Sequence, residues 1–416
     1  MIARANRSVY PRRMPNPTRR RLLQLLGAAS AATAWPTREA LGAARNGTPR
    51  ARSAESAAQS AGTCRGSLIG MSRMRVEGGR ERFAVVRIDL HERPLRVRPI
   101  AVPFYGHGVA FDPRDSGRAL IFEKHGPGCC EVDLRRGRMV RQVDASPGCQ
   151  FYGHGAFSAD GALLYCTETE VAGGTMRGLI AVRDGRTLQR RGELPSHGTA
   201  PHDLVLCDKG RALVVGNGGG SLVSGRVPSV AWVAPETGAL LWRQELDDKG
   251  VTAGHLALAD GGEGQVVAVI SAPRDGLDLK ALDVHGAVGL ARRGEAASSG
   301  TATMARVFRD PIAAKMRGET LSLAVLPGGL VAATNPEGDL ITVWELGSGK
   351  LRSSHADFSR PRGLTIDRTG RCLALSHGVD ARLTLLDPRS LRPLSGATLE
   401  QAWISGSHLA ICDLGA

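Results

Sequence analysis

The feature that most constrains this chain is a short motif that recurs along most of its length. The segment YGHGVAF at 105–111 reappears as YGHGAF at 152–157. Weaker copies begin near residues 202, 255, 322, 362 and 408, so the step is about 40–53 residues, with one longer step between the fourth and fifth copies. Most copies contain an alternating strand, a polar turn and a second strand, the pattern of a β-hairpin. A self-similar period of this length indicates a repeat-built fold.

Seven such units predict an all-β, seven-bladed β-propeller (WD40/YVTN-like) over residues 63–416, because a four-stranded blade needs about 40–50 residues. The last unit has only an inner strand before the chain stops, and segments 66–72, 83–90 and 95–102 could supply its missing strands. We expect the N- and C-terminal strands to pair and close the ring, which would leave no open edge. Rings of six or eight blades remain alternatives.

The first 44 residues have the order of segments found in an export signal. Thr18 precedes the arginines 19–21, and a mildly apolar stretch runs from Leu22 to Ala34 before small-residue cleavage candidates. Residues 1–44 therefore predict a twin-arginine signal peptide and a periplasmic protein, with an arginine-rich tail as the alternative. Residues 45–62, rich in Ala, Ser, Gly and Arg, predict a disordered linker. No segment has the roughly 18 apolar residues that a membrane span requires.

The net charge of +14 is concentrated at the N-terminus. Residues 1–62 carry eleven arginines against two acidic residues, which leaves a charge of about +5 on the other 354 residues. The remaining arginines are scattered through turns. Because a nucleic-acid-binding protein needs a localised basic footprint, we expect no nucleic-acid partner.

The repeated motif carries a histidine in five of the seven copies. In a propeller the innermost strand of each blade lines the central channel, so these side chains would converge near the channel mouth. They are His107, His154, His202, His255 and His408. Ser322 and Arg362 occupy about the same place in the other two copies and are expected to line the channel. Converging imidazoles are suited to a transition metal such as iron or copper, or to an anion. The alternative is that the histidines only hydrogen-bond backbone groups between blades.

Eight cysteines raise the question of disulfides, which an oxidising compartment would allow. Cys129 or Cys130 with Cys149 is the candidate pair, since these residues lie in predicted loops that flank the second and third units. No Cys-x-x-Cys, Gly-x-Ser-x-Gly, phosphate-loop or His-Glu-x-x-His motif occurs. Nothing in the sequence therefore identifies catalytic residues, and we lean toward a non-enzymatic protein.

The paired Tyr-Gly-His-Gly motifs and the leader together resemble domain-of-unknown-function family 1513 over nearly all of residues 63–416. The resemblance implies an exported β-propeller encoded beside imelysin-like and di-haem peroxidase-like proteins in iron-uptake loci. It brings no established active site. We therefore expect a periplasmic accessory protein for iron acquisition that binds metal or a metal carrier at the histidines. A scaffold for periplasmic uptake proteins is the alternative, and a lactonase-like or redox enzyme is a third reading.

Overall fold

The structure, a computed structural model, describes residues 64–76, 79–172, 177–259, 266–274, 285–293 and 305–414. Contacts divide the chain into two units, one of Met1–Arg50 with Val76–Arg80 and one of Ala51–Arg75 with Glu81–Ala416. The 28 strands of the described residues all belong to the second unit. The expected signal peptide (1–44) and linker (45–62) lie outside the described residues.

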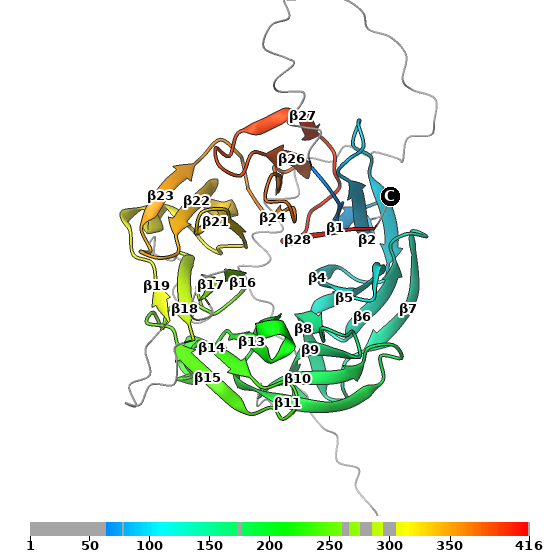
Figure 1. The fold of residues 1–416 in the computed structure, drawn as a ribbon, viewed down its shortest axis with the longest axis vertical. Coiled ribbons are helices and arrows are strands. Elements are labelled where there is room, and N and C mark those ends of the chain that lie inside the picture. Colours follow the sequence, from blue (N-terminus) through cyan, green and yellow to red (C-terminus); the bar gives the residue numbers. More distant parts are fainter. Residues whose placement is uncertain are drawn as a thin grey trace, which may run out of the picture. The chain divides into compact units, whose positions relative to one another are not determined.

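The strands of the second unit form antiparallel sheets around a common centre, with β4, β8, β16 and β28 nearest to it (Figure 1). The sheet that contains both ends of the unit consists of β28 (Leu409–Cys412), β1 (Ser67–Arg75), β2 (Glu81–Asp89) and β3 (Arg98–Val102). An eight-stranded sheet follows, made of β4 (Gly106–Asp112), β5 (Asp115–Gly126), β6 (Gly128–Asp133), β7 (Arg138–Asp144), β8 (Cys149–Phe157), β9 (Leu163–Glu170), β10 (Arg177–Asp184) and β11 (Arg190–Thr199).

Four further sheets have four strands each, in simple chain order. They are β12 (Pro201–Cys207), β13 (Ala212–Asn217), β14 (Ser229–Val233) and β15 (Leu240–Glu245); β16 (Leu256–Ala259), β17 (Val266–Ser271), β18 (Ala287–Arg292) and β19 (Arg306–Val307); β20 (Ser322–Leu326), β21 (Leu330–Asn335), β22 (Leu340–Glu345) and β23 (Leu351–His355); and β24 (Leu364–Ile366), β25 (Leu373–His377), β26 (Arg382–Leu386) and β27 (Pro393–Leu399). Short 3₁₀ turns, η3 (Asp208–Gly210), η4 (Leu222–Ser224), η5 (Pro311–Lys315) and η6 (Pro336–Gly338), lie between strands.

The all-β propeller is confirmed, but the strand pairing gives five four-stranded blades rather than the expected seven. The sixth sheet has eight strands because β5 is 12 residues long and its far end also pairs with β8. Lys124 lies opposite Tyr152 in this pairing, and Gly126 lies opposite Phe151. The two blades expected at this place are therefore joined by hydrogen bonds into one sheet.

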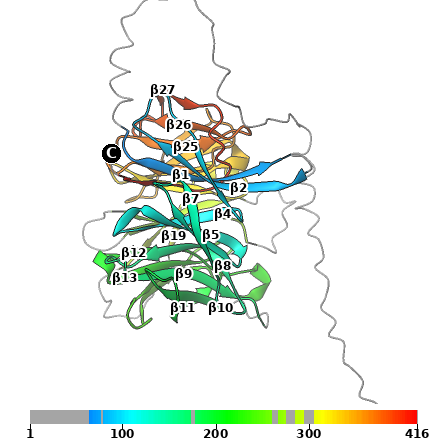
Figure 2. The same cartoon turned by 90° about the vertical axis from the view of Figure 1, so that its right-hand side faces the viewer.

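The two ends of the second unit meet in one sheet. Strand β28 pairs antiparallel with β1, with Ser67 opposite Cys412 and Gly70 opposite Leu409. The sheet of β1 also lies beside the sheet of β24–β27 in both views (Figures 1 and 2). Buried apolar residues of these two sheets, such as Leu68 and Leu383, form one hydrophobic cluster. The last strand of the chain is thus held by the first.

The core is divided into clusters between neighbouring sheets. Trp232 of β14 belongs to a cluster that reaches Val267 of β17, and Trp344 of β22 belongs to one that reaches Ile270. Middle strands such as β13 are buried along their whole length, whereas β7, which is the fourth of its group, alternates exposed and half-buried residues. A strand packed on both faces needs continuous apolar residues, and an edge strand does not.

Turns between strands are stabilised by acidic side chains. The carboxylate of Asp367 accepts hydrogen bonds from the backbone N–H groups of Arg371 (2.9 Å) and Cys372 (3.0 Å). Asp160 accepts the N–H of Ala162 at 3.0 Å in the same way. These carboxylates are explained by turn geometry.

One buried ion pair joins two strands of the eight-stranded sheet. Glu168 of β9 is fully buried, and its carboxylate lies 3.0 Å from the guanidinium of Arg183 on β10. The same guanidinium donates to the carbonyl oxygen of Asp144 at 2.8 Å. The second carboxylate oxygen of Glu168 accepts the N–H of Ser146 at 3.2 Å. Because both charges have partners, this pair has a structural explanation.

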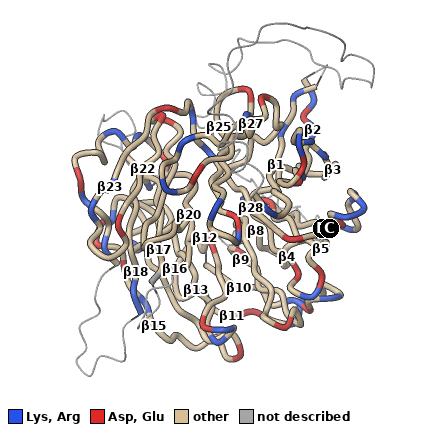
Figure 3. The backbone as a smooth tube through the Cα atoms, turned by 45° about the horizontal axis from the view of Figure 1, so that its top comes forward, with Lys and Arg blue, Asp and Glu red and all other residues tan. Residues whose placement is uncertain are grey.

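Basic and acidic residues are interspersed along the described backbone (Figure 3). Many arginines lie beside acids of the same sheet, as Arg118 does with Asp112 (2.8 Å) and Glu131 (3.0 Å). The absence of a nucleic-acid partner stays a prediction. Within the described part of the chain, no helix is both long and apolar enough to cross a bilayer.

Candidate metal centre

The repeat places five histidines at equivalent positions of five strand groups. His107 and His202 are the second residues of β4 and β12, His154 lies in the middle of β8, and His255 and His408 come immediately before β16 and β28. Each of these strands is the first of its group in chain order except β28, which closes the sheet of β1. Since equivalent positions of repeated blades face the same centre, the side chains converge.

The five imidazoles form one contiguous cluster. One ligand nitrogen each of His107, His154, His255 and His408 lies within 4.8 Å of the others. The Nε2 atoms of His107 and His408 are 3.1 Å apart, and those of His202 and His255 are 3.2 Å apart. The distance between ring centroids is 4.1 Å for His255 and His408 and 4.4 Å for His202 and His255. The expected convergence of all five histidines is therefore present in the structure.

A buried aspartate lies beside two of these rings. Asp203 follows His202 in β12, and one of its carboxylate oxygens lies 3.2 Å from Nδ1 of His154. The other oxygen lies 3.9 Å from Nδ1 of His255. The carboxylate also accepts the N–H groups of Leu204 (2.7 Å) and Leu256 (2.9 Å), which fix its position. A carboxylate on Nδ1 orients the opposite ring nitrogen toward a metal.

The threonine at position 167 connects neighbouring repeats beneath the cluster. Its hydroxyl, on β9, lies 3.1 Å from the carbonyl oxygen of His154 and 3.2 Å from that of His202. These contacts fix the backbone of two histidines that belong to different strand groups. The two imidazoles are therefore positioned by the second strand of one group as well as by their own strands.

Burial controls the protonation of the cluster. It lowers the pKa of all five imidazoles, and in the case of His154 the pKa falls to about 3. The positive charge of Lys124 adds to the effect of burial on His154 and His202. The imidazoles are thus neutral at ordinary pH, which is the form that binds metal. Burial also raises the pKa of Asp203, against the hydrogen bonds that it accepts.

Two ring nitrogens of the cluster are buried without a hydrogen-bond partner among the described residues. They are Nε2 of His154 and Nδ1 of His255. A buried polar atom with no partner carries a desolvation cost of about 1–3 kcal/mol. A purely structural role would be expected to satisfy these atoms with backbone groups. An additional ligand at the cluster would satisfy the nitrogen of His154.

Glycines of the Tyr-Gly-His-Gly motifs allow the first two histidines to approach each other. A Cβ atom on Gly108 would overlap the carbonyl oxygen of Gly153 and would lie 2.8 Å from Nδ1 of His154. Gly153 has a φ of +110°, and a Cβ atom there would lie 2.5 Å from the ring of His107. The motif is therefore a packing requirement of β4 against β8 at the cluster.

A cavity of about 130 Å³ adjoins the histidines. His202 and His255 form part of its wall, together with Lys124, Glu319 and Tyr152. The ring of Tyr152 lies 5.7 Å from that of His202. The cluster is thus adjacent to a space that a small molecule can occupy.

The two other predicted channel positions have different surroundings. The hydroxyl of Ser322 is buried and exchanges hydrogen bonds with the backbone of Leu364, accepting its N–H at 3.0 Å. The carbonyl oxygen of Arg362 accepts the hydroxyl of Thr334 at 2.6 Å. Both residues take part in contacts between neighbouring sheets, and neither belongs to the four-histidine group. Their lining of a channel stays a prediction.

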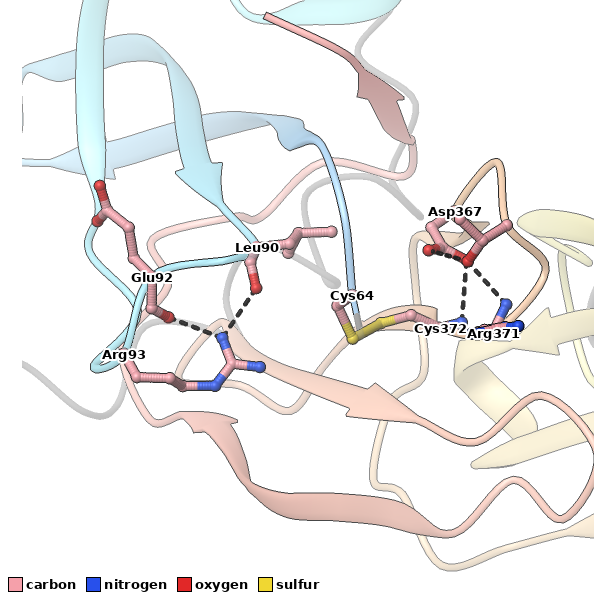
Figure 4. The surroundings of a disulfide bond; sticks show 8 residues. Cys64, Leu90, Glu92, Arg93, Asp367, Arg371 and Cys372 are labelled. Carbon is pink, nitrogen blue, oxygen red and sulfur yellow. Dashed lines mark hydrogen bonds between the residues drawn. A yellow bond between two sulfur atoms is a disulfide. The ribbon is translucent and has the colours of Figure 1, made fainter. Parts of the chain in front are cut away.

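The expected disulfide is wrong, and a different one is present. Cys129, Cys130 and Cys149 are free thiols. Cys129 and Cys130 are neighbours on β6, and alternate residues of a strand face opposite sides, so they fill two different hydrophobic clusters. Cys64 pairs with Cys372 instead, across 308 residues of sequence (Figure 4). The bond joins the segment before β1 to the turn before β25, next to the Asp367 carboxylate.

Sequence reasoning missed Asp203 and Lys124. Asp203 had a signal, because the third copy reads Pro-His-Asp where the first two copies read Gly-His-Gly. Lys124 had none, because it lies near the far end of an unusually long strand and approaches the histidines through the pairing of β5 with β4 and β8. Both contribute charge to the cluster.

These features define a β-propeller with a buried histidine cluster at the inner ends of its strands. The family described as "Protein of unknown function (DUF1513)" matches residues 100–404, and the chain belongs to this family. No curated protein matches the chain.

Solved structures with the same fold include hydrazine synthase of Kuenenia stuttgartiensis, with a TM-score of 0.57 and 14% identity over 75% of this chain and 93% of that one. The Cps50 (Swd1) β-propeller domain of Myceliophteria thermophila has a TM-score of 0.53 and 14% identity, over 77% and 96%. At this identity the likeness concerns the fold alone.

Proposed function

We propose that the histidine cluster binds a transition-metal ion. The observation that carries the proposal is the convergence of four imidazole nitrogens within 4.8 Å of one another, with neutral rings and a carboxylate behind two of them. In a tetrahedral site with metal–nitrogen bonds of 2.0–2.1 Å, neighbouring ligand nitrogens are about 3.3 Å apart. Within the four-histidine group, the Nε2 atoms of His107 and His408, 3.1 Å apart, are close to this separation.

The donor set narrows the choice of metal. Imidazole suits zinc, copper, iron and nickel, whereas calcium and magnesium prefer oxygen. Three or four of the histidines would ligate the ion, and Asp203 would orient His154 through its Nδ1 atom, 3.2 Å away. Cysteine sulfur does not belong to the four-residue group, which favours a site without thiolate.

The biological setting is part of the same proposal. The order of segments in residues 1–44 supports export to the periplasm by the twin-arginine pathway. Because that pathway carries folded and metal-loaded proteins, such export is consistent with a bound metal. The family resemblance supports a non-enzymatic accessory role in iron acquisition, beside imelysin-like and di-haem peroxidase-like partners. A scaffold that docks uptake proteins on the propeller is the second candidate, and it would leave the histidines as structural elements.

The proposal includes a count of seven blades in a closed ring. The eight-stranded sheet is then two blades, β4–β7 and β8–β11, that share a short hydrogen-bonded contact. Seven hydrophobic clusters among the described residues support this count, because each one lies between consecutive groups of four strands. They include one between β24–β27 and the sheet of β1.

The test is the metal content of the full chain exported through its own leader and purified without a histidine tag. We expect near-stoichiometric iron, copper or zinc by elemental analysis, and its loss in the His107→Ala/His154→Ala variant. The matched control is His91→Ala/His355→Ala, since these histidines do not belong to the cluster. Circular dichroism of each variant checks the fold.

A protein that carries no metal and takes up none of these ions on incubation would overturn the metal proposal. Co-purification of periplasmic proteins with that metal-free protein would favour the scaffold.

A further inference from the structure

The cavity beside the histidine cluster has the features of a second-ligand site. Its volume of about 130 Å³ is below the roughly 300–1,000 Å³ of pockets that hold drug-sized ligands, so it suits a small ligand. The wall formed by His202 and His255 is continuous with the cluster, because the Nε2 atoms of these residues are 3.2 Å apart. A small ligand in the cavity would therefore adjoin a metal held by the histidines.

The cavity wall carries one basic and one acidic side chain, Lys124 and Glu319. Burial lowers the pKa of Lys124, and the negative charge of Glu319 acts against this. A divalent ion at the cluster would add two positive charges beside the ammonium of Lys124. An anion is the ligand that offsets this excess.

A buried hydroxyl on the wall points to the same conclusion. Thr320 is 2% exposed, lines the cavity, and its Oγ1 has no hydrogen-bond partner among the described residues. Leaving such a hydroxyl unsatisfied is costly, and a ligand oxygen would accept its proton. Ser271 and Thr252 line the same cavity with further hydroxyls.

We propose that this cavity binds a carboxylate of one or two carbons, with one oxygen on the metal and the carboxylate held by Lys124 and Thr320. The proposal rests on the metal site proposed above. The small volume of the cavity favours a small carboxylate over a larger one. A carboxylate oxygen can ligate a transition metal, and a hydrogen bond between an ammonium group and a carboxylate is among the stronger ones in proteins.

The experiment uses the full exported chain loaded with cobalt(II), whose visible spectrum responds to a change of ligand. Cobalt content is measured first by elemental analysis, and acetate is then titrated. We expect a saturable spectral change with acetate and none with benzoate at the same concentration. Lys124→Met should weaken acetate binding by about tenfold or more while the cobalt content is unchanged, because a charge-assisted contact is lost. The matched control is Lys350→Met, an exposed lysine on a turn.

The outcomes separate the two proposals. A chain that holds no cobalt overturns the metal site, and the carboxylate site with it. Bound cobalt with no response to acetate, or with equal acetate affinity in the wild type and Lys124→Met, overturns the carboxylate site alone. Should Lys124→Met fail to fold, Thr320→Val gives the same comparison, since it removes the hydroxyl and keeps the shape of the side chain.

Discussion

At the scale of single residues, the histidines of the motif are held neutral by their surroundings. The imidazoles are shielded by neighbouring strands, and Lys124 places a positive charge nearby. The pKa of each ring in the folded chain therefore lies below its ordinary value of 6.5. An unfolded chain has no such constraint and takes up protons below pH 6.5. Folding and protonation of these side chains consequently oppose each other.

The stability of the metal-free protein should fall as the pH falls below about 6.5. At pH 5.5 each histidine that stays neutral only in the folded state lowers the free energy of unfolding by about 1.4 kcal/mol relative to neutral pH. Urea unfolding at pH 7.5 and 5.5 measures the difference. In His107→Gln/His154→Gln the difference should shrink by about 3 kcal/mol, because two of these groups are gone. An equal difference in the wild type and the variant would contradict the assignment.

At the scale of elements, β4 and β8, each the first strand of its group of four, approach each other closely at their glycines. Strands β4 and β8 carry the two Tyr-Gly-His-Gly motifs, and the backbone of Gly108 faces the carbonyl oxygen of Gly153. This approach brings the rings of His107 and His154 to a centroid separation of 4.9 Å. A side chain on Gly108 would separate the strands at the place where the cluster forms.

Gly108→Ala should destabilise the protein by about 1–3 kcal/mol, the usual cost of overpacking, and should lower its metal content. The measurements are urea unfolding and elemental analysis of the purified variant. Gly192→Ala on β11 is the matched control, since a Cβ atom there would meet nothing within 4 Å. Unchanged metal content in Gly108→Ala would show that the motif glycines are not needed for the site.

At the scale of the whole described unit, its two ends are joined in two ways. The β28–β1 pairing places the last strand in the sheet of the first, and the Cys64–Cys372 disulfide ties the segment before β1 to the neighbouring sheet (Figure 4). Both contacts connect residues more than 300 positions apart. Each restricts opening at the junction between the first and last sheets.

Removal of this disulfide should lower the free energy of unfolding by about 2–5 kcal/mol, because a crosslink over 308 residues restricts the unfolded chain. Cys64→Ser, measured by urea unfolding without reductant, should match the reduced wild type. Cys149→Ser removes a free thiol and should change the stability little. Equal stability of the oxidised wild type and Cys64→Ser would argue against the bond.

The sequence by itself determined the repeat, and the repeat determined the propeller and the convergence of five histidines. The propeller could be predicted because hairpin periodicity and turn residues are local properties of the sequence. The convergence of the histidines could be predicted because equivalent positions of repeats face the same centre. The pairing of the terminal strands was expected because the last repeat has only one strand and the N-terminal segments could supply the others.

Only the tertiary structure decided which groups complete the site and how the sheets join. Asp203, Lys124 and the cavity depend on contacts between strands that are far apart in sequence. The β5–β8 pairing depends on the length and course of one strand, and the pairing of Cys64 with Cys372 depends on which thiols meet across 308 residues. The three cysteines expected to pair are instead core residues or a free thiol at a strand start, because neighbouring positions on a strand face opposite sides. Such long-range contacts leave no periodic signal in a single sequence.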